Sequence, residues 1–203
     1  MSTPDATVVT ATAEGGRTLA WTFDDGPDPE HTPALLAVLR EHGITATFFL
    51  WGDHVREHPE VARQIAREGH VLGNHSMHHD DMGSWSPEQA RADLAATIDL
   101  IREVVPDAEV PWFRAPFGSW GPTPQVAAEL GMQPLGWSVV VEDWEEPGAD
   151  VLVERVLERL APAAVVLLHD GGGDRSGTVE AVARLAPRLL ADGWTFGLPA
   201  ASA

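Results

Sequence analysis

The sequence has no cysteine, no tyrosine and no lysine among its 203 residues. Without cysteine, disulfide bonds, thiolate zinc sites and cysteine nucleophiles are all excluded. The 13 basic residues are all arginine, and 31 acidic residues outnumber them, which gives a formal net charge of -18. Such an acidic surface repels phosphate backbones, so we expect no nucleic acid among its partners.

Long apolar runs are also missing. Residues 1–16 contain no basic segment followed by an apolar stretch of signal-peptide length. No uninterrupted apolar run approaches the length of a membrane span. We therefore expect a soluble monomer with no membrane span, either cytoplasmic or secreted with its signal segment already removed.

Short apolar runs alternate with amphipathic stretches along most of the chain, which predicts an α/β fold with a largely parallel sheet. About seven strands fit the pattern, and the chain is shorter than the roughly 250 residues of a regular eight-unit barrel. We predict a single domain folded as a deformed (β/α) barrel over residues 17–203, preceded by an N-terminal extension over residues 1–16. A doubly wound open sheet remains the alternative, because periodicity does not show closure.

Three helix starts carry capping signals. Thr32 and Thr123 each precede a proline, which predicts a capping side chain ahead of the first helical residue. Ser86, followed three residues later by Gln89, predicts a capping box.

Polar clusters follow five of the expected strands at the point where each strand ends. In either α/β architecture the carboxyl ends of parallel strands meet on one face, where loops build the functional site. We therefore expect the five clusters to converge. In chain order they are Asp24 with Asp25, the histidines His75, His78 and His79, then Arg114, Asp143 with Trp144, and His169 with Asp170.

Two of these histidines suit a metal site. His75 and His79 are four residues apart and would point the same way on a helical turn. Together with one carboxylate they form a ligand set that leaves coordination positions open. His78 points in a different direction and is assigned to solvent. The other histidines fall in or beside helical stretches and are assigned structural or solvated places: His31, His42, His54, His58 and His70.

The adjacent carboxylates of Asp24 and Asp25 would repel each other if both were simply buried. A divalent cation bound to one of them would leave the other free as a proton acceptor beside metal-bound water. The spacing does not decide which aspartate takes which part. The alternative is that one of them caps the turn that begins at Gly26.

Five segments in order, TFDDGP, HSMHH, RAPFG, EDW and LLHD, give the chain a specific resemblance. It resembles the polysaccharide deacetylases of carbohydrate esterase family 4, which contain the NodB-homology domain, from about Arg17 to Leu198. The resemblance implies a deformed (β/α) barrel and metal-dependent removal of acetyl groups from N-acetylated or O-acetylated carbohydrate, such as chitooligosaccharide, peptidoglycan or xylan.

The resemblance also implies roles in catalysis for four residues. Asp24 would be the base and Arg114 would hold it in place. His169 would be the general acid, and Asp143 would tune it.

The implied metal ligands are Asp25, His75 and His79. Zinc suits two histidines and a carboxylate, while cobalt, nickel, iron or manganese could bind the same set.

The substrate contacts are inferred in two ways. Trp144 and Leu167 match positions that wall the pocket for the acetyl methyl group. Phe117 stands where relatives often have tyrosine, and Trp85 and Trp120 lie near the motifs, where indole rings can stack on sugar faces.

Two other functions remain open from the sequence. An intracellular deacylase of a small N-acyl metabolite would use the same metal site. A catalytically inactive carbohydrate-binding domain would keep the scaffold, although such a binder has no use for a base and an acid together.

Overall fold

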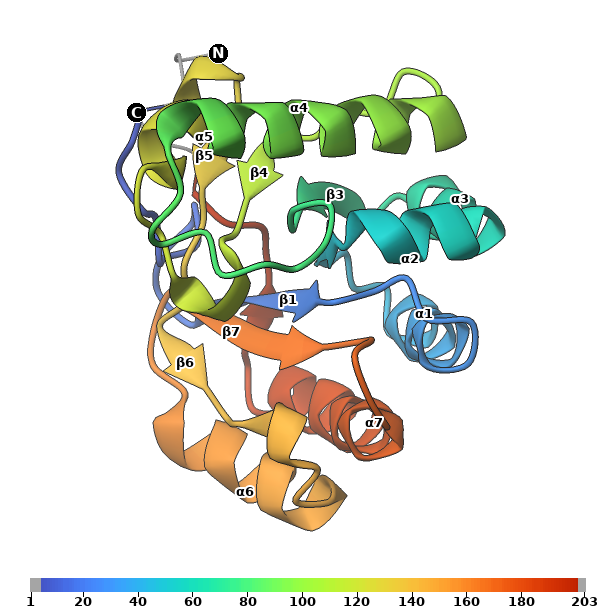
Figure 1. The fold of residues 1–203 in the computed structure, drawn as a ribbon. Coiled ribbons are helices and arrows are strands. Elements are labelled where there is room, and N and C mark those ends of the chain that lie inside the picture. Colours follow the sequence, from blue (N-terminus) through green and yellow to red (C-terminus); the bar gives the residue numbers. More distant parts are fainter. Residues whose placement is uncertain (1–4, 201–203) are drawn as a thin grey trace.

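The computed structural model describes residues 5–200. Their strands are β1 (Thr18–Asp24), β2 (Thr47–Leu50), β3 (Val71–Asn74), β4 (Trp112–Phe113), β5 (Gln133–Pro134), β6 (Val139–Val140), β7 (Ala164–His169) and β8 (Thr195–Phe196). Seven of them form a parallel sheet in the order β5-β4-β3-β2-β1-β7-β6, and β8 pairs in parallel with the start of β1 (Figure 1).

Helices connect the strands on the outside of the curled sheet (Figure 1). They are α1 (His31–Glu41), α2 (Gly52–Glu57), α3 (Pro59–Arg67), α4 (Pro87–Val104), α5 (Thr123–Glu129), α6 (Ala149–Arg159) and α7 (Ser176–Ala191), with short 3₁₀ turns at Pro116–Gly118 and Asp143–Glu145. Between residues 5 and 200, no helix is both long and apolar enough to cross a membrane.

Alternation along β1 explains how one strand serves two cores. Leu19, Trp21 and Phe23 belong to the large cluster that packs against the helices, whereas Ala20 belongs to a small cluster on the concave side. Side chains of a strand point alternately to the two faces, so Asp24 continues the concave series. Helices cover only the convex face, which confirms the deformed (β/α) barrel and rules out the doubly wound alternative.

The sheet curls without closing through a strand ladder. In the part of the chain that the structure describes, β5 and β6 do not pair, and four residues link them. Val9 bonds to the backbone beside β5 and Ala11 bridges to Ala164, so the segment before β1 spans the gap. The boundary at residue 17 stays a prediction.

The capping predictions had different outcomes. Both hydrogen bonds of the Ser86 and Gln89 capping box are present at the start of α4. The caps at Thr32 and Thr123 are wrong, because both threonines lie inside their helices. The Thr32 hydroxyl is instead engaged with Asp170, a residue of the site described next.

Candidate metal centre and active site

The carboxylate at the end of β1 is held by a buried arginine. Arg114 is fully buried and donates from Nη1 to Asp24 Oδ1 at 2.7 Å and to Thr22 Oγ1 at 2.8 Å. Its remaining donors reach the carbonyl oxygens of Leu135 and Gly136. Burial lowers the pKa of Arg114, and the charge and hydrogen bond of Asp24 oppose that shift. The expected contact between Arg114 and Asp24 is present.

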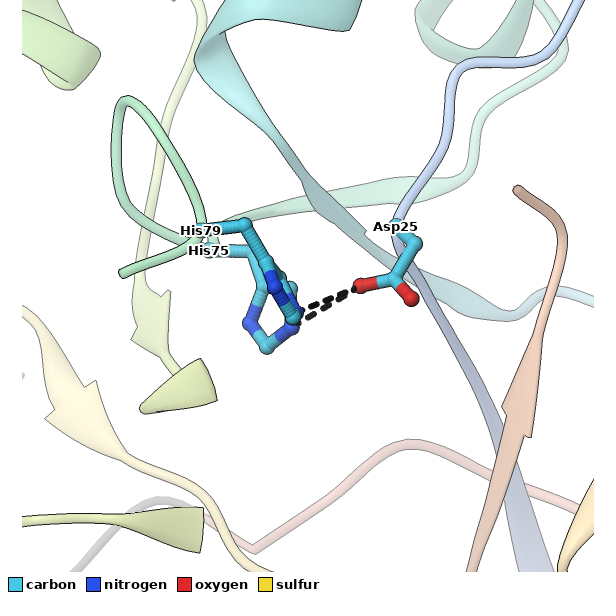
Figure 2. Close-up of side chains that lie close together, drawn as sticks. All are labelled: Asp25, His75 and His79. Carbon is cyan, nitrogen blue, oxygen red and sulfur yellow. Dashed lines mark ion pairs between the residues drawn. The ribbon is translucent and has the colours of Figure 1, made fainter. Parts of the chain in front are cut away.

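A carboxylate and two imidazoles meet beside this pair. Asp25 Oδ1 lies 3.2 Å from His75 Nε2 and 3.1 Å from His79 Nε2. Figure 2 shows the Asp25 carboxylate pointing at both rings, which reach it from one loop. All three ligand atoms lie within 4.8 Å of one another, which makes the group a candidate metal centre. Asp24 Oδ2 is 3.7 Å from His75 Nε2 and therefore stands at the edge of this group.

The two histidines converge by a different route from the one predicted. They lie on an irregular loop after β3 and not on a helical turn. Ser76 and His79 both have positive φ, and the His79 amide donates to Ser76 Oγ at 3.0 Å, which closes the loop. His78 points away and bonds to Asp53 at 2.8 Å on the surface, as expected.

The chemistry of this group fits a divalent cation. The Arg114 carbonyl can only accept, so His75 Nδ1 carries the proton at 2.8 Å, and in the neutral ring Nε2 presents a lone pair toward Asp25. Asp25 Oδ1 is buried and has no hydrogen-bond partner. Lone pairs that converge in this way require a shared positive charge. Burial raises the pKa of Asp25, but its close contacts with His75 and His79 and the charges of His75 and His169 outweigh burial and hold this pKa well below its usual range.

The imidazole at the end of β7 is oriented by a second carboxylate. His169 Nδ1 donates to Asp143 Oδ1 at 2.7 Å, and the His169 amide donates to Asp143 Oδ2 at 2.8 Å. Thr178 adds a bond from its hydroxyl to the same carboxylate. Burial lowers the pKa of His169, but the bond and charge of Asp143 outweigh it and raise this pKa to about 9. His169 is therefore protonated at neutral pH.

These groups open into one cavity of about 510 Å³. The cavity brings together the residues of the candidate metal centre, Asp24, His169 and three of the predicted substrate contacts. Its lining is Asp24, Asp25, Trp51, His75, His79, Ala115, Phe117, Gly118, Trp137, Trp144, Leu167, His169, Gly172 and Arg175.

The predicted substrate contacts divide into two groups. Phe117 is 71% exposed, Trp144 is 44% exposed, and Leu167 is buried at the wall. The Trp144 ring stands edge-on to His169, with centroids 5.5 Å apart. Trp85 and Trp120 do not line the cavity, because both pack against the main hydrophobic core. Sugar contact by these two stays a prediction for units that extend beyond the cavity.

A sequence model of one family matches residues 11–135, a range that holds the metal-centre residues, Asp24 and Arg114. The model is that of the polysaccharide deacetylases. The chain belongs to this family. The resemblance inferred from the five segments is thereby confirmed.

Close relatives cover nearly the whole chain. The chitooligosaccharide deacetylase of Rhizobium leguminosarum bv. trifolii is 36% identical over 192 residues, which cover 89% of each chain. The peptidoglycan-N-acetylglucosamine deacetylase of Bacillus cereus is 38% identical over 181 residues, covering 88% of this chain and 84% of the relative.

One structural neighbour is instructive because it is described as a pseudoenzyme. This family 4 carbohydrate esterase from Bacillus anthracis has a TM-score of 0.87 and 29% identity, covering 97% of this chain and 68% of the neighbour. Membership of the polysaccharide deacetylase family therefore does not by itself establish activity in a given chain, and the side chains of the site must be considered one by one.

Sequence reasoning missed one buried group of this site, Arg175. Arg175 lines the cavity and donates to the carbonyl oxygens of Gly171, Gly172 and Asp143 at 2.8 to 3.2 Å. It thereby ties the loop after β7 to the turn that holds Asp143. An arginine that follows a glycine run directly after a predicted site residue was the available signal.

Asp170 was expected at the site with His169, but the sequence assigned it no role. It follows His169, is 1% exposed, and accepts the Thr32 hydroxyl bond on Oδ2 at 2.5 Å. Its amide donates to the Asp24 carbonyl oxygen at 3.0 Å. Burial and the nearby charges of Asp25 and Asp24 raise the pKa of Asp170 to about 7.

Proposed function

We propose that this chain is an active deacetylase that removes acetyl groups from N-acetylglucosamine units of an oligosaccharide or polysaccharide. One observation carries the proposal. A carboxylate paired with a buried arginine and an imidazolium paired with a buried aspartate open into the same cavity as a carboxylate and two imidazoles suited to a metal.

The metal ligands in this proposal are Asp25, His75 and His79. When bound there, a divalent cation supplies Lewis-acid polarisation of the acyl oxygen and lowers the pKa of a coordinated water. Zinc suits this ligand set, and cobalt, nickel, iron or manganese are alternatives. A measurement of the metal content of the purified protein distinguishes among them.

Asp24 acts as the base in this proposal. Its bond to Arg114 fixes one oxygen, while the other oxygen stays near the metal centre and can take a proton from the attacking water. Arg114 is a positioning residue, because its donors are used by Asp24 and by backbone oxygens.

His169 acts as the acid in this proposal. Amide cleavage requires a proton on the departing nitrogen, and His169 is protonated at neutral pH because of Asp143. The Nδ1 proton is used by Asp143, so the proton that reaches the substrate leaves from Nε2.

The acetyl group lies against Trp144 and Leu167, which wall the cavity beside His169. Phe117, which is exposed and stands edge-on to the His79 ring, is placed to contact the sugar ring. We infer N-acetylglucosamine because the chitooligosaccharide and peptidoglycan deacetylases named above share that unit. Ester substrates such as acetylated xylan remain a second class to test.

The competing functions differ in what they require. An inactive carbohydrate-binding domain gains nothing from a base and an acid that are each held by a separate buried partner. A deacylase of a small N-acyl metabolite would use the same groups, so substrate length distinguishes it. A monomer stays a prediction that light scattering can check, and the location of the protein stays open.

Acetate release tests the proposal. Metal-loaded protein, with and without chelator, is given N-acetylglucosamine oligomers, the acetylated monosaccharide, acetylated xylan and small N-acyl amides. We expect chelator-sensitive release from the oligomers. Release only from the small amides would favour the metabolite deacylase, and no release by protein shown to hold metal would favour the binding domain.

A further inference from the structure

A four-residue segment between β2 and the body of α2, Trp51–His54, touches both loops of the metal centre. On the first loop, the Trp51 amide donates to the Gly26 carbonyl oxygen at 2.9 Å, and His54 Nδ1 donates to the Asp25 carbonyl oxygen at 2.7 Å. We call residues 51–54 the bridging segment. None of its residues lies in the five segments that carry the family resemblance.

The bridging segment holds the second loop through two consecutive amides. Gly52 donates to the Ser76 carbonyl oxygen and Asp53 donates to the Met77 carbonyl oxygen, both at 3.0 Å. Gly52 packs so closely on Met77 that a Cβ there would lie 2.9 Å from the Met77 Cα. In Figure 1, α2 accordingly lies between the loop that leaves β1 and the end of β3.

Both loops need such support because their backbones are strained. Asp25, Ser76 and His79 have φ values of 70°, 67° and 56°, a region that non-glycine residues adopt at a cost. Strained residues persist only where the surrounding structure fixes them. Asp25 and Ser76 each present a carbonyl oxygen to the bridging segment, so its bonds act directly on the strained peptides.

The aromatic rings of the segment add a second contact. Trp51 packs between His54, with centroids 4.1 Å apart, and the metal-centre ring of His79, with centroids 5.1 Å apart. His54 therefore contacts His79 indirectly, through the Trp51 ring, and also donates a hydrogen bond to the backbone of Asp25.

The Asp25 carbonyl oxygen receives its hydrogen bond from His54. A Cβ on Gly171 would lie only 2.3 Å from that oxygen, so the loop after β7 closes over it on one side. His54 supplies a donor on the other. Because a carbonyl oxygen only accepts, Nδ1 of His54 must carry the proton, which fixes the tautomer of the ring.

We propose that His54 is a positioning residue of the metal centre, whose bond to the Asp25 carbonyl oxygen sets the direction of the Asp25 carboxylate toward His75 and His79. The proposal rests on the metal site of the proposed function. Groups that orient metal ligands from outside the coordination sphere typically change metal affinity by 10-fold to 100-fold when they are removed.

The test measures metal affinity directly. Dissociation constants for Zn²⁺ and Co²⁺ are determined by chelator competition for the wild type, His54→Ala, His54→Asn and the control His58→Ala, which lies just beyond α2. We expect a loss of about 10-fold to 100-fold in His54→Ala and a changed visible spectrum of its Co²⁺ form. His54→Asn keeps a donor at a similar reach and should recover most of the affinity, while His58→Ala should match the wild type.

Folded His54→Ala protein with wild-type affinity would overturn the proposal. Equal losses of metal affinity in the alanine and asparagine variants, together with a fall in the unfolding midpoint of the metal-free protein, would also overturn it. That result would indicate a general structural role for His54. A wild type that binds neither metal would contradict the metal site of the proposed function. If the metal affinities of the wild type and the His54 variants differ as expected but the protein releases no acetate, the result would contradict the proposed substrate and support the His54 proposal.

Discussion

Asp24 and His169 are partners across the parallel ladder between β1 and β7, so the proposed base and acid leave the same end of adjacent strands. Each is hydrogen-bonded to a different buried group: Arg114 binds the Asp24 carboxylate, and Asp143 binds the His169 imidazole. One register therefore places two groups of opposite charge at one cavity.

Replacing Asp24 by asparagine should reduce kcat/KM by about 10²-fold or more, because the amide cannot accept a proton from water. Metal affinity should change little, since Asp24 stands at the edge of the ligand set. Steady-state kinetics and chelator competition on the same preparation check both parts. Asparagine keeps an oxygen for Arg114, and the unfolding midpoint shows whether the pair still supports the fold. A variant that retains near-full activity would refute the base assignment.

Replacing His169 by alanine should harm amide cleavage more than ester cleavage, because an alkoxide leaves more easily than an unprotonated amine anion. The measurement compares matched N-acetyl and O-acetyl substrates for the wild type and the variant, and takes the ratio of the two losses. Equal losses on both substrates would contradict the assignment of His169 as the acid.

Replacing Asp143 by asparagine should move the alkaline limb of the pH–rate profile to lower pH. The bond and charge of Asp143 are the main reasons that the pKa of His169 lies at about 9, so without the charge the acid loses its proton earlier as the pH rises. Profiles between pH 6 and pH 10 check the shift. Thr178→Val serves as the control, because it removes a bond to Asp143 without removing charge. An unmoved limb in the asparagine variant would count against this coupling.

Replacing Asp170 by asparagine should change how stability depends on pH. Burial, followed by nearby carboxylates, raises the pKa of Asp170 from 3.8 to about 7, so the folded protein binds a proton that the unfolded chain has released. The stabilising contribution is complete below about pH 4 and is lost as the pH rises toward 7, by up to about 1.4 kcal/mol per pH unit. Urea unfolding of metal-free protein at several values in this range should show a shallower decline for the variant. Parallel declines in both proteins would show that Asp170 does not titrate in this way.

The residues of the site could be found from the sequence because of a property of parallel sheets. Strands that run in one direction end on one face, so polar residues at the ends of β1, β3 and β7 or directly after them had to meet there. Asp24, Asp25 and His169 were identified by that argument alone.

The backbone conformation that brings the site residues together could not be predicted in the same way. The four-residue spacing of His75 and His79 suggested a helical turn, but the structure uses a loop with left-handed residues, a conformation that spacing does not reveal. Trp85 and Trp120 are near the site residues in sequence yet pack into the main core.

The fold class, the family and the donor atoms of the site could be read from the chain alone, because the succession of strands and helices, helix periodicity and residue type are properties of the linear sequence. Which buried groups hold those donors became clear only from the folded structure. Arg114 on Asp24, His54 on the Asp25 carbonyl oxygen and Thr32 on Asp170 join residues 29 to 138 positions apart. Such bonds form because buried polar groups must find partners in space, and distance along the chain places no limit on which partner is found.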